Sequence, residues 1–501
     1  MMTLAPIFTD HAVLQREKPV CIFGTCTDGA VITLTMGDIA CESNPAADGR
    51  WEILLPPLPA GGPYTLSVTD GQESLTISDI MLGEVWLCGG QSNMELNLKD
   101  AKGAQDALNS CENSNVRLYH VCKRGFFDEQ FYREEADSCW NLPSVHTCPY
   151  WSAVGYYFAR ELAEKLGVTV GLVNCNYGGT SASAWMSREM LAETAVGRLY
   201  LEDYAKGTEG LTDEEADRAY DAYMDYHIRW NEKVARCYAQ DPAMKWAKVL
   251  EICGENLYPG PHAPKNPLRP HGLYDTMVRR IIPYTLRGVL YYQGESDDHR
   301  PDGYALLLTS LIRQWRRDFR DEQLPFLMVQ LPIYGVEDTP DYMHWCRIRE
   351  AQEEVYRSVR NTGLAVILEC GEWNEIHPKE KEIPAHRLYL QALHHVYDLQ
   401  HENTCAPMFD YALPENGGMR LFFRHAQCGL EARGSSGFEL CGTDGIWHEA
   451  QAQINEDTIY VRSKAVDAPA AARYCWRNYT DVTVFARNGL PLAPLRTDKR
   501  Y

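Results

Sequence analysis

The fold is decided by the stretch Met81-Leu82-Gly83-Glu84-Val85-Trp86-Leu87-Cys88-Gly89-Gly90-Gln91-Ser92-Asn93-Met94. Val85 to Cys88 is a compact apolar run, which indicates a buried parallel strand. The run ends at Gly89-Gly90, shortly before Ser92. Because glycine lets the backbone turn sharply, we expect the Ser92 hydroxyl to project past the sheet edge, beside N–H groups that can bind an anion.

Two other interpretations of Ser92 can be compared with a role as nucleophile. The nucleophile elbow of α/β-hydrolases needs a second glycine two residues after the serine, where this chain has Met94, so that interpretation fails. Alternatively, Ser92 only caps a helix that follows the glycine turn. The other motifs of the chain have to distinguish between these two roles of Ser92, nucleophile and helix cap.

Length and charge limit the class of protein. At 501 residues the chain is too long for one ordinary core. Its hydrophobic content of 45% is that of a globular protein. A net charge of −21 argues against nucleic acid or an anionic membrane surface as a partner.

The sequence contains neither an apolar run of membrane-spanning length nor a basic, apolar leader at its start. We therefore expect a cytoplasmic location for the chain as given, or a periplasmic or secreted one if a signal peptide has been removed. The 17 cysteines include no C-x-x-C pair, which argues against a zinc ribbon or a redox motif. The sequence predicts no metal site and no cofactor.

Three regions differ in pattern. Residues 1–78 read as short strands separated by glycine turns, which predicts a β-sandwich-like domain; its expected strands are 13–15, 20–24, 31–35, 51–55 and 64–68. Residues 79–400 alternate strands with helical stretches, which predicts an α/β domain with a parallel sheet. Residues 405–501 return to a β-rich pattern, with strands expected at 420–423, 438–442, 458–461 and 472–476.

Within the α/β region, a helix is expected over 150–162 and buried strands over 168–173, 289–292, 326–329 and 364–368. A charged, mostly helical stretch at about 188–254 reads as an insertion that shapes the site or forms subunit contacts, so a homodimer is possible. Thr212 is expected to cap one of its helices, with Glu215 as the reciprocal partner.

Three strand ends carry polar or glycine-rich loops, and ligands collect at the carboxyl ends of strands in open α/β sheets. The first carries Ser92. The second contains Gly178-Gly179, where a backbone N–H can approach a ligand oxygen, and the third carries the side-chain amide of Gln293. Acyl transfer needs a nucleophile, a base, an orienter of the base and donors for the developing oxyanion. These loops supply the nucleophile and the donors.

His377 is the best candidate for the base, because it follows the last apolar strand of the α/β region. Glu375, two residues earlier, can orient the imidazole through Nδ1 and leave Nε2 to take the Ser92 proton. Asn374 or a backbone carbonyl can share that role. His299 is a rival base from the Gln293 loop.

Four blocks of the sequence resemble, in order and rough spacing, the sialate O-acetylesterase family, a branch of the SGNH hydrolases. They are Gly83-Glu84-Val85-Trp86 leading into Gly90-Gln91-Ser92-Asn93-Met94, then Gly178-Gly179-Thr180 followed by Ala184-Trp185-Met186-Ser187, then Tyr291-Tyr292-Gln293-Gly294-Glu295-Ser296, and finally Ile376-His377-Pro378-Lys379. The resemblance covers nearly the whole chain. It implies a three-layer α/β/α domain of SGNH type, flanked by the two β-sandwich-like regions.

The resemblance also implies roles for single residues. Ser92 would be the nucleophile and His377 the general base and then acid. The oxyanion hole would consist of the backbone N–H groups of Ser92 and Gly179 and the Gln293 amide. The family has aspartate where this chain has Glu375, which keeps the charge and adds one methylene. The expected substrate contacts are Gln91, Asn93 and Glu295. For Glu295 the alternative is a carboxylate that supports the site without touching the substrate.

The function implied by the resemblance is removal of O-acetyl groups from sialic acid through an acetyl-enzyme, with an O-acetylated sugar as the partner and no cofactor. One alternative is deacetylation of a neutral plant glycan such as acetylated xylan, which suits the acidic net charge. Another is a catalytically inactive glycan-binding protein, for which the Glu375 replacement is the only argument.

Overall fold

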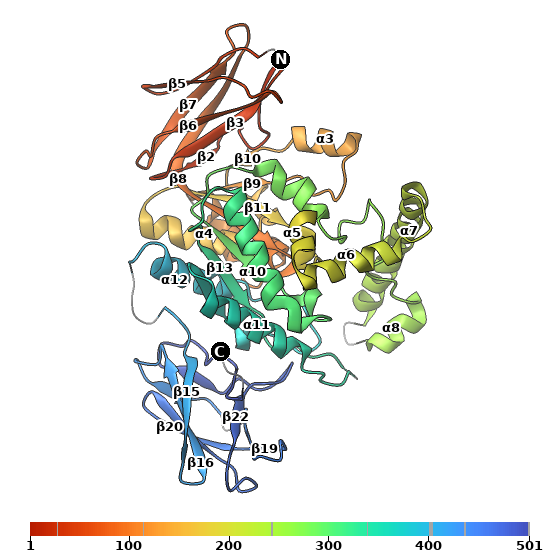
Figure 1. Cartoon of the computed structure of the whole chain (residues 1–501), viewed down its shortest axis with the longest axis vertical. Helices are drawn as coiled ribbons and strands as arrows, with labels where there is room; N and C mark the ends of the chain where they lie inside the picture. The colour runs from red at the N-terminus through yellow and green to blue at the C-terminus, as the bar shows by residue number, and fades with distance from the viewer. Residues whose placement is uncertain are drawn as a thin grey trace.

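The structure is a computed structural model that describes residues 1–27, 29–113, 115–241, 244–337, 339–399, 404–434 and 437–498. It is a mixed α/β fold with several β-sheets. Figure 1 shows the N-terminal strands at one end of the long axis, the region that contains most helices in the middle, and the C-terminal strands at the other end.

The N-terminal strands match the predicted ones closely. They are β1 (Met2–Leu4), β2 (Val13–Gln15), β3 (Val20–Cys26), β4 (Ile32–Met36), β5 (Ile39–Ser43), β6 (Arg50–Leu55) and β7 (Gly61–Thr69). The five predicted strands are confirmed to within a few residues, whereas β1 and β5 were not predicted. The order β1-β3-β6 forms a separate sheet, while β2 and β7 both pair with the next strand of the chain.

That next strand, β8 (Ser74–Gly90), is 17 residues long and belongs to two parts of the molecule. Its first half pairs with β7 in antiparallel register, from Thr69 opposite Ser74 to Gly61 opposite Leu82. Its second half pairs in parallel with β11 and β12. The strand therefore continues without interruption through position 78, where the sequence pattern changes.

The central part of the sheet has the strand order β10-β9-β11-β8-β12-β13-β14. From β9 to β14 the neighbours pair in parallel, and β10 is antiparallel to β9. The bounds are β9 (Val116–His120), β10 (Trp140–Asn141), β11 (Val170–Asn176), β12 (Gly288–Tyr292), β13 (Phe326–Gln330) and β14 (Thr362–Val366). Every residue of β11 to β14 is buried, as expected for strands covered on both faces. The four predicted strands are confirmed, with β14 ending two residues early.

Two helix pairs pack against these strands. The first pair, α4 (Ala153–Leu166) and α12 (Glu382–His395), is in contact, and so is the second, α10 (Pro301–Asp318) and α11 (His344–Ser358). In Figure 1, α4 and α12 lie toward the left of the central region, and α10 and α11 cross its middle. The predicted helix over 150–162 is α4. Short helices complete this region: α1 (Ser92–Glu95), α2 (Ala104–Ser110), α3 (Glu129–Ala136) and α9 (Arg279–Ile281).

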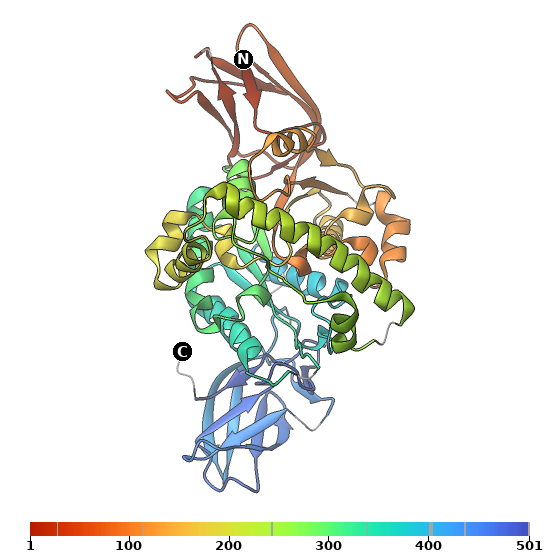
Figure 2. The same cartoon turned by 90° about the vertical axis from the view of Figure 1, so that its right-hand side faces the viewer.

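The stretch at about 188–254 is helical, as predicted. It contains α5 (Arg188–Glu193), α6 (Ala195–Gly207), α7 (Asp213–Gln240) and α8 (Trp246–Cys253). Thr212 and Glu215 form the predicted capping box at the start of α7. The buried side chains of α7 form two small clusters of their own, apart from the main core. Figure 2 shows α7 as the long yellow-green helix that crosses in front of the central region.

The C-terminal region is β-rich, as predicted, and forms three small sheets ordered β15-β16-β21-β20, β17-β23 and β19-β18-β22-β24. The strands are β15 (Met408–Glu415), β16 (Gly418–Arg424), β17 (Leu430–Ala432), β18 (Phe438–Cys441), β19 (Trp447–Glu449), β20 (Gln451–Asn455), β21 (Thr458–Arg462), β22 (Ala471–Tyr474), β23 (Val484–Ala486) and β24 (Leu495–Arg496). The four predicted strands correspond to β16, β18, β21 and β22.

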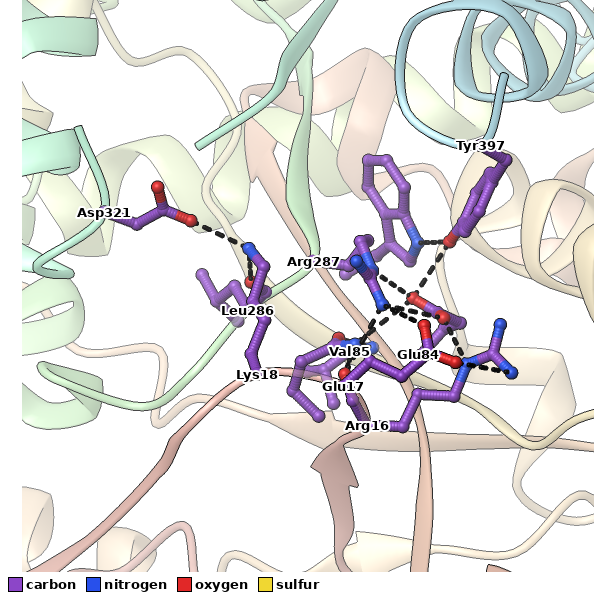
Figure 3. A network of polar contacts seen from close by, with 11 residues as sticks. Arg16, Glu17, Lys18, Glu84, Val85, Leu286, Arg287, Asp321 and Tyr397 are labelled. Carbon is purple, nitrogen blue, oxygen red and sulfur yellow. Dashed lines mark hydrogen bonds and ion pairs between the residues drawn. The ribbon is translucent and has the colours of Figure 1, made fainter. Parts of the chain in front are cut away.

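A buried carboxylate holds β8 where it enters the central sheet (Figure 3). Glu84 is 0% exposed. Its oxygens accept hydrogen bonds at 2.6 Å from Nε of Arg16, which follows β2, and at 2.6 Å from Nε of Arg287, which precedes β12. Tyr397, just after α12, donates its hydroxyl to the same carboxylate at 3.0 Å. One side chain therefore joins the N-terminal strands, the central sheet and the last helix.

No helix in the part of the chain that the structure describes is long and apolar enough to cross a membrane. All 17 cysteines lie within it and are free of disulfides, and most of them are buried.

Substituting Glu84→Gln keeps the shape of the side chain but leaves two partly buried guanidinium groups without their counterion. Breaking a buried ion pair from one side typically costs about 3–5 kcal/mol. We expect the free energy of unfolding to fall by about this amount in urea titrations. Glu52, an exposed partner of Arg320 at 2.6 Å, is the matched control, because Glu52→Gln removes only a surface pair worth about 1 kcal/mol or less. Equal effects of the two substitutions would contradict the anchoring role of Glu84.

Candidate active site

The turn after β8 presents Ser92 at the carboxyl end of the strand. Gly90 has φ +130°, and a Cβ there would lie 2.2 Å from the carbonyl oxygen of Tyr292 in β12. Only glycine permits this close approach. The Gln91 N–H then bonds the same carbonyl at 3.0 Å, and Ser92 is the first residue of α1. The N-cap is Gln91, without a side-chain cap, so the alternative of Ser92 as the capping residue is wrong.

His377 meets the serine. Its Nε2 lies 2.8 Å from Ser92 Oγ, which is a hydrogen bond. The histidine comes from the loop between β14 and α12, as predicted. Burial lowers the pKa of His377 below its usual value, Lys381 and Lys379 lower it further, and Glu375 and Glu95 act in the opposite direction. The imidazole is therefore neutral at pH 7 and can accept a proton.

Glu375 lies beside His377, but not in the expected hydrogen bond. Its Oε1 accepts the backbone N–H of His377 at 2.7 Å. The distance from the same oxygen to His377 Nδ1 is 3.9 Å, which is an ion-pair distance and too long for a hydrogen bond. The carboxylate thus acts on the imidazole through its charge and shapes the loop through the backbone.

The Gly178-Gly179 loop after β11 packs against the serine. A Cβ on Gly178 would lie 3.5 Å from Ser92 Cβ. The Gly178 N–H is already donated to Glu95. Gly179 has φ +75°, and its carbonyl accepts the Tyr258 hydroxyl at 3.0 Å. Within the described ranges, the N–H groups of Ser92 and Gly179 have no intramolecular acceptor, so both can donate to a bound oxygen.

Gln293 is buried and its amide is committed to other protein groups. Nε2 lies 2.6 Å from Asp297 Oδ2, 3.1 Å from Thr180 O and 3.2 Å from Gln91 Oε1. Its Oε1 accepts the Tyr304 hydroxyl at 2.9 Å. Because an amide nitrogen has only two hydrogens, these three acceptors use its donor capacity. The amide therefore joins the loops after β8, β11 and β12, and it would have to leave one of these acceptors to meet an oxyanion.

Asp297 is the centre of this network and was not predicted from the sequence. The fully buried carboxylate accepts hydrogen bonds from the Ser181 hydroxyl at 2.6 Å, the Ala182 N–H at 2.9 Å, the Tyr200 hydroxyl at 2.5 Å and the Gln293 amide at 2.6 Å. Four donors compensate the cost of burying the charge. The one signal in the sequence is its position four residues after Gln293.

A second buried network joins the serine helix to the histidine loop. Asn93 Nδ2 donates to Glu295 Oε1 at 2.7 Å and to the Ile376 carbonyl at 3.0 Å, and its Oδ1 accepts from Lys381 Nζ at 2.7 Å. Burial lowers the pKa of Lys381 to about 8 and raises that of Glu295. Asn93 follows Ser92 and Ile376 precedes His377. The hydrogen bond from Asn93 to Ile376 therefore links the two segments that carry the Ser92–His377 pair.

The three residues expected to contact substrate are all buried. Gln91 is 2% exposed, Asn93 1% and Glu295 5%, and each is hydrogen-bonded to protein groups. These hydrogen bonds hold the three side chains in the interior around the serine turn. The rival base His299 is exposed and contacts Tyr200 and Arg300, whereas the hydrogen bond to Ser92 comes from His377.

Comparison with known proteins gives the class of this site. Residues 82–208 and 261–378 match the family model described as carbohydrate esterase, sialic acid-specific acetylesterase. The mouse sialate O-acetylesterase is 26% identical over 95% of this chain and 89% of its own length, and the human one is 24% identical over 95% and 87%. The crystal structure of a carbohydrate acetylesterase from Xanthomonas citri covers all of both chains with a TM-score of 0.79 and 28% identity.

The fold and the matches identify the chain as a carbohydrate esterase, an acetylesterase that hydrolyses carboxylic esters. Its sequence is similar to those of the sialic acid-specific acetylesterases. The two blocks of the family match contain Ser92 and His377, the residues that the structure brings into hydrogen-bonding distance.

Replacing Asp297 with alanine should lower kcat for a small aryl acetate, because the loops that carry Gly179 and Gln293 lose their common acceptor. We expect a loss of about 10²- to 10³-fold, the effect of one misplaced oxyanion donor, with a smaller loss for Asp297→Asn. Asp298→Ala, on the adjacent and more exposed residue, is the control and should retain activity. A fall in urea stability without a fall in kcat would show that Asp297 serves stability alone.

Proposed function

We propose that this protein is a serine esterase that removes O-acetyl groups from sialic acid through an acetyl-enzyme intermediate. The observation that carries the proposal is the 2.8 Å hydrogen bond between His377 Nε2 and Ser92 Oγ. Without that bond the serine would be an ordinary hydroxyl with no base to activate it.

In the first half of the reaction, Ser92 Oγ attacks the acetyl carbonyl carbon while its proton passes to His377 Nε2. The carbonyl oxygen becomes an oxyanion, which the free N–H groups of Ser92 and Gly179 receive. When the tetrahedral intermediate collapses, the bond to the sugar oxygen breaks and the imidazolium donates its proton to that oxygen. The sugar leaves with its hydroxyl restored, and Ser92 carries the acetyl group.

In the second half, a water molecule takes the place of the sugar and gives a proton to His377 as it attacks the acetyl carbon. The second tetrahedral intermediate releases acetate and returns the proton to Ser92 Oγ. Glu375 stabilises the imidazolium in both halves through its charge at 3.9 Å. The chemistry needs only side chains and backbone of this chain.

The role of Gln293 follows from its contacts. The Gln293 amide would join the oxyanion hole only by giving up one of its three acceptors for the oxyanion. Of these acceptors, Gln91 Oε1 is the most distant, at 3.2 Å. We therefore place the Ser92 and Gly179 N–H groups first in the oxyanion hole and Gln293 as a third donor after such an exchange. Gln91, Asn93 and Glu295 position the serine and the histidine loop.

The architecture that we propose for the catalytic region is the three-layer SGNH type with a parallel sheet. The parallel pairings from β9 to β14 and the two helix pairs that pack on these strands support it. The nucleophile, the glycine loop and Gln293 then stand at the carboxyl ends of three adjacent strands.

The proposal is tested by acetate release from 9-O-acetylated sialic acid, acetylated xylo-oligosaccharide and an aryl acetate. We expect release from the sialic acid, and a loss of about 10⁴-fold or more in Ser92→Ala and His377→Gln, because triad members act as a unit. Ser74→Ala, on the exposed part of β8, is the control and should match the unmodified protein. Release from the xylan alone would keep the mechanism and change the substrate. Failure on all three substrates would refute the esterase.

The pH profile tests the state of His377. Only the neutral imidazole can accept the Ser92 proton, so kcat/KM falls as pH drops through the pKa of His377, which burial places below 6.5. Glu375 raises the pKa of His377 through its negative charge. Glu375→Gln is therefore expected to move the acid limb of the kcat/KM–pH profile, where activity falls as His377 is protonated, to lower pH. Its kcat should fall by less than the roughly 10⁴-fold loss caused by removing a buried, hydrogen-bonded orienter.

Glu372→Gln is the matched control for this shift, because it removes an exposed carboxylate of the same loop. Its acid limb should stay in place. A limb that moves upward in Glu375→Gln, or an unchanged kcat, would contradict the electrostatic role of Glu375.

A further inference from the structure

A cluster of nitrogen and sulfur side chains lies where the catalytic region meets the C-terminal strands. His394 and His395 are the last two residues of α12, and Cys405 lies shortly before β15. One potential ligand atom from each of the three lies within 4.8 Å of the others. We propose that this cluster, which we call the junction cluster, binds a zinc-type divalent cation that joins α12 to the C-terminal strands.

The spacing suits a small cation. Zinc bonds to histidine nitrogen at about 2.0–2.1 Å and to cysteine sulfur at about 2.3 Å, in tetrahedral geometry, so its ligand atoms lie about 3.5 Å apart. Side-chain movements of about 1 Å would bring the junction cluster from its present spacing to that geometry. Imidazole and thiolate together select zinc over magnesium or calcium, which prefer oxygen ligands.

His395 contributes an independent observation. Its Nε2 is buried and, in the part of the chain that the structure describes, has no hydrogen-bond partner. A buried polar atom without a partner is costly, and an ion is one of the few groups that satisfy it.

Cys405 is surrounded by groups that favour a metal-bound sulfur. Gln391 Nε2 donates to its Sγ at 3.5 Å, and Thr404 Oγ1 lies 3.9 Å from it. Burial raises the pKa of the Cys405 thiol, while hydrogen bonds from Gln391, Thr404 and Tyr356 act in the opposite direction. N–H and O–H donors around a ligating atom are the usual outer support of a metal site. A bound zinc ion would displace the thiol proton outright.

We assign the fourth ligand to His425, which follows β16 and lines a cavity of about 300 Å³ together with His395. Of the three arginines that line this cavity, Arg357, Arg360 and Arg424, two have acidic partners: Arg424 bonds Asp410 at 2.7 Å and Arg357 bonds Glu353 at 2.8 Å. The carboxyl end of α12 also favours a positive charge through the helix dipole.

The test uses the full chain and cobalt(II) as a spectroscopic substitute for zinc. We expect one Co²⁺ per chain, with the near-ultraviolet charge-transfer band of a thiolate ligand and the visible bands of a tetrahedral site, all displaced by an equivalent of Zn²⁺. Zinc should also raise the thermal midpoint, because it binds only the folded state. Binding weaker than millimolar, or octahedral spectra without the thiolate band, would overturn the proposal.

Two variants locate the site. Cys405→Ser should lose the thiolate band, and His395→Gln should keep the band while binding Co²⁺ more than about 100-fold more weakly, since even outer-sphere substitutions cost 10- to 100-fold. Cys428→Ser, on a partly buried cysteine outside the junction cluster, is the matched control and should bind normally.

Aryl acetate hydrolysis checks that each variant is folded. If Cys405→Ser does not fold, the result with His395→Gln decides. A thiolate band that persists in Cys405→Ser, or disappears in Cys428→Ser, would refute the assignment.

Discussion

The buried carboxylate of Glu84 is the constraint on which the position of the serine depends. A strand that slips by one residue turns every side chain to the opposite face. Before it reaches the active site, β8 pairs first with β7 and then with β11 and β12. Arg16 and Arg287, each 2.6 Å from Glu84, hold the strand from both neighbouring segments. The charges are paired inside the protein, where an unpaired one would be prohibitively costly. The register of β8 at Gly90 is therefore fixed several residues before the turn.

The serine turn depends on a second constraint, the close approach of Gly90 to Tyr292. This contact sets β12 directly beside the turn, so that the Gln293 loop begins where the serine helix begins. Asp297 and Gln293 then bind the loop after β11 to the loop after β12, and Asn93 binds the serine helix to the histidine loop. Catalysis gains most from donors that are already in place before charge develops. Two buried polar networks, one around Asp297 and one around Asn93, provide this order.

Some features of the fold and of the site could be predicted from the sequence, and others could not. The strands and their polar ends were predicted because apolar runs and glycine breaks are local signals, and Ser92 and His377 could be paired because both follow such runs. The orientation of the Gln293 side-chain amide could not be predicted from the sequence, since it depends on contacts with Tyr304 and Asp297. The hub role of Asp297 depends on Tyr200, which the helical insertion brings in from far along the chain. Glu375 was expected to bond Nδ1, but a carboxylate two residues before the histidine reaches the backbone N–H first.

The helical insertion and the segment that follows it reach the glycine loop after β11. Tyr258, in the segment that follows α8, donates its hydroxyl to the Gly179 carbonyl, and a Cβ on Gly179 would meet that hydroxyl at 2.3 Å. Tyr200 of α6 reaches the same loop through Asp297. The insertion and the segment after it thus hold the glycine loop from two directions, once through the Gly179 carbonyl and once through a buried carboxylate. In the part of the chain that the structure describes, the Gly179 N–H of this loop is left without an intramolecular acceptor.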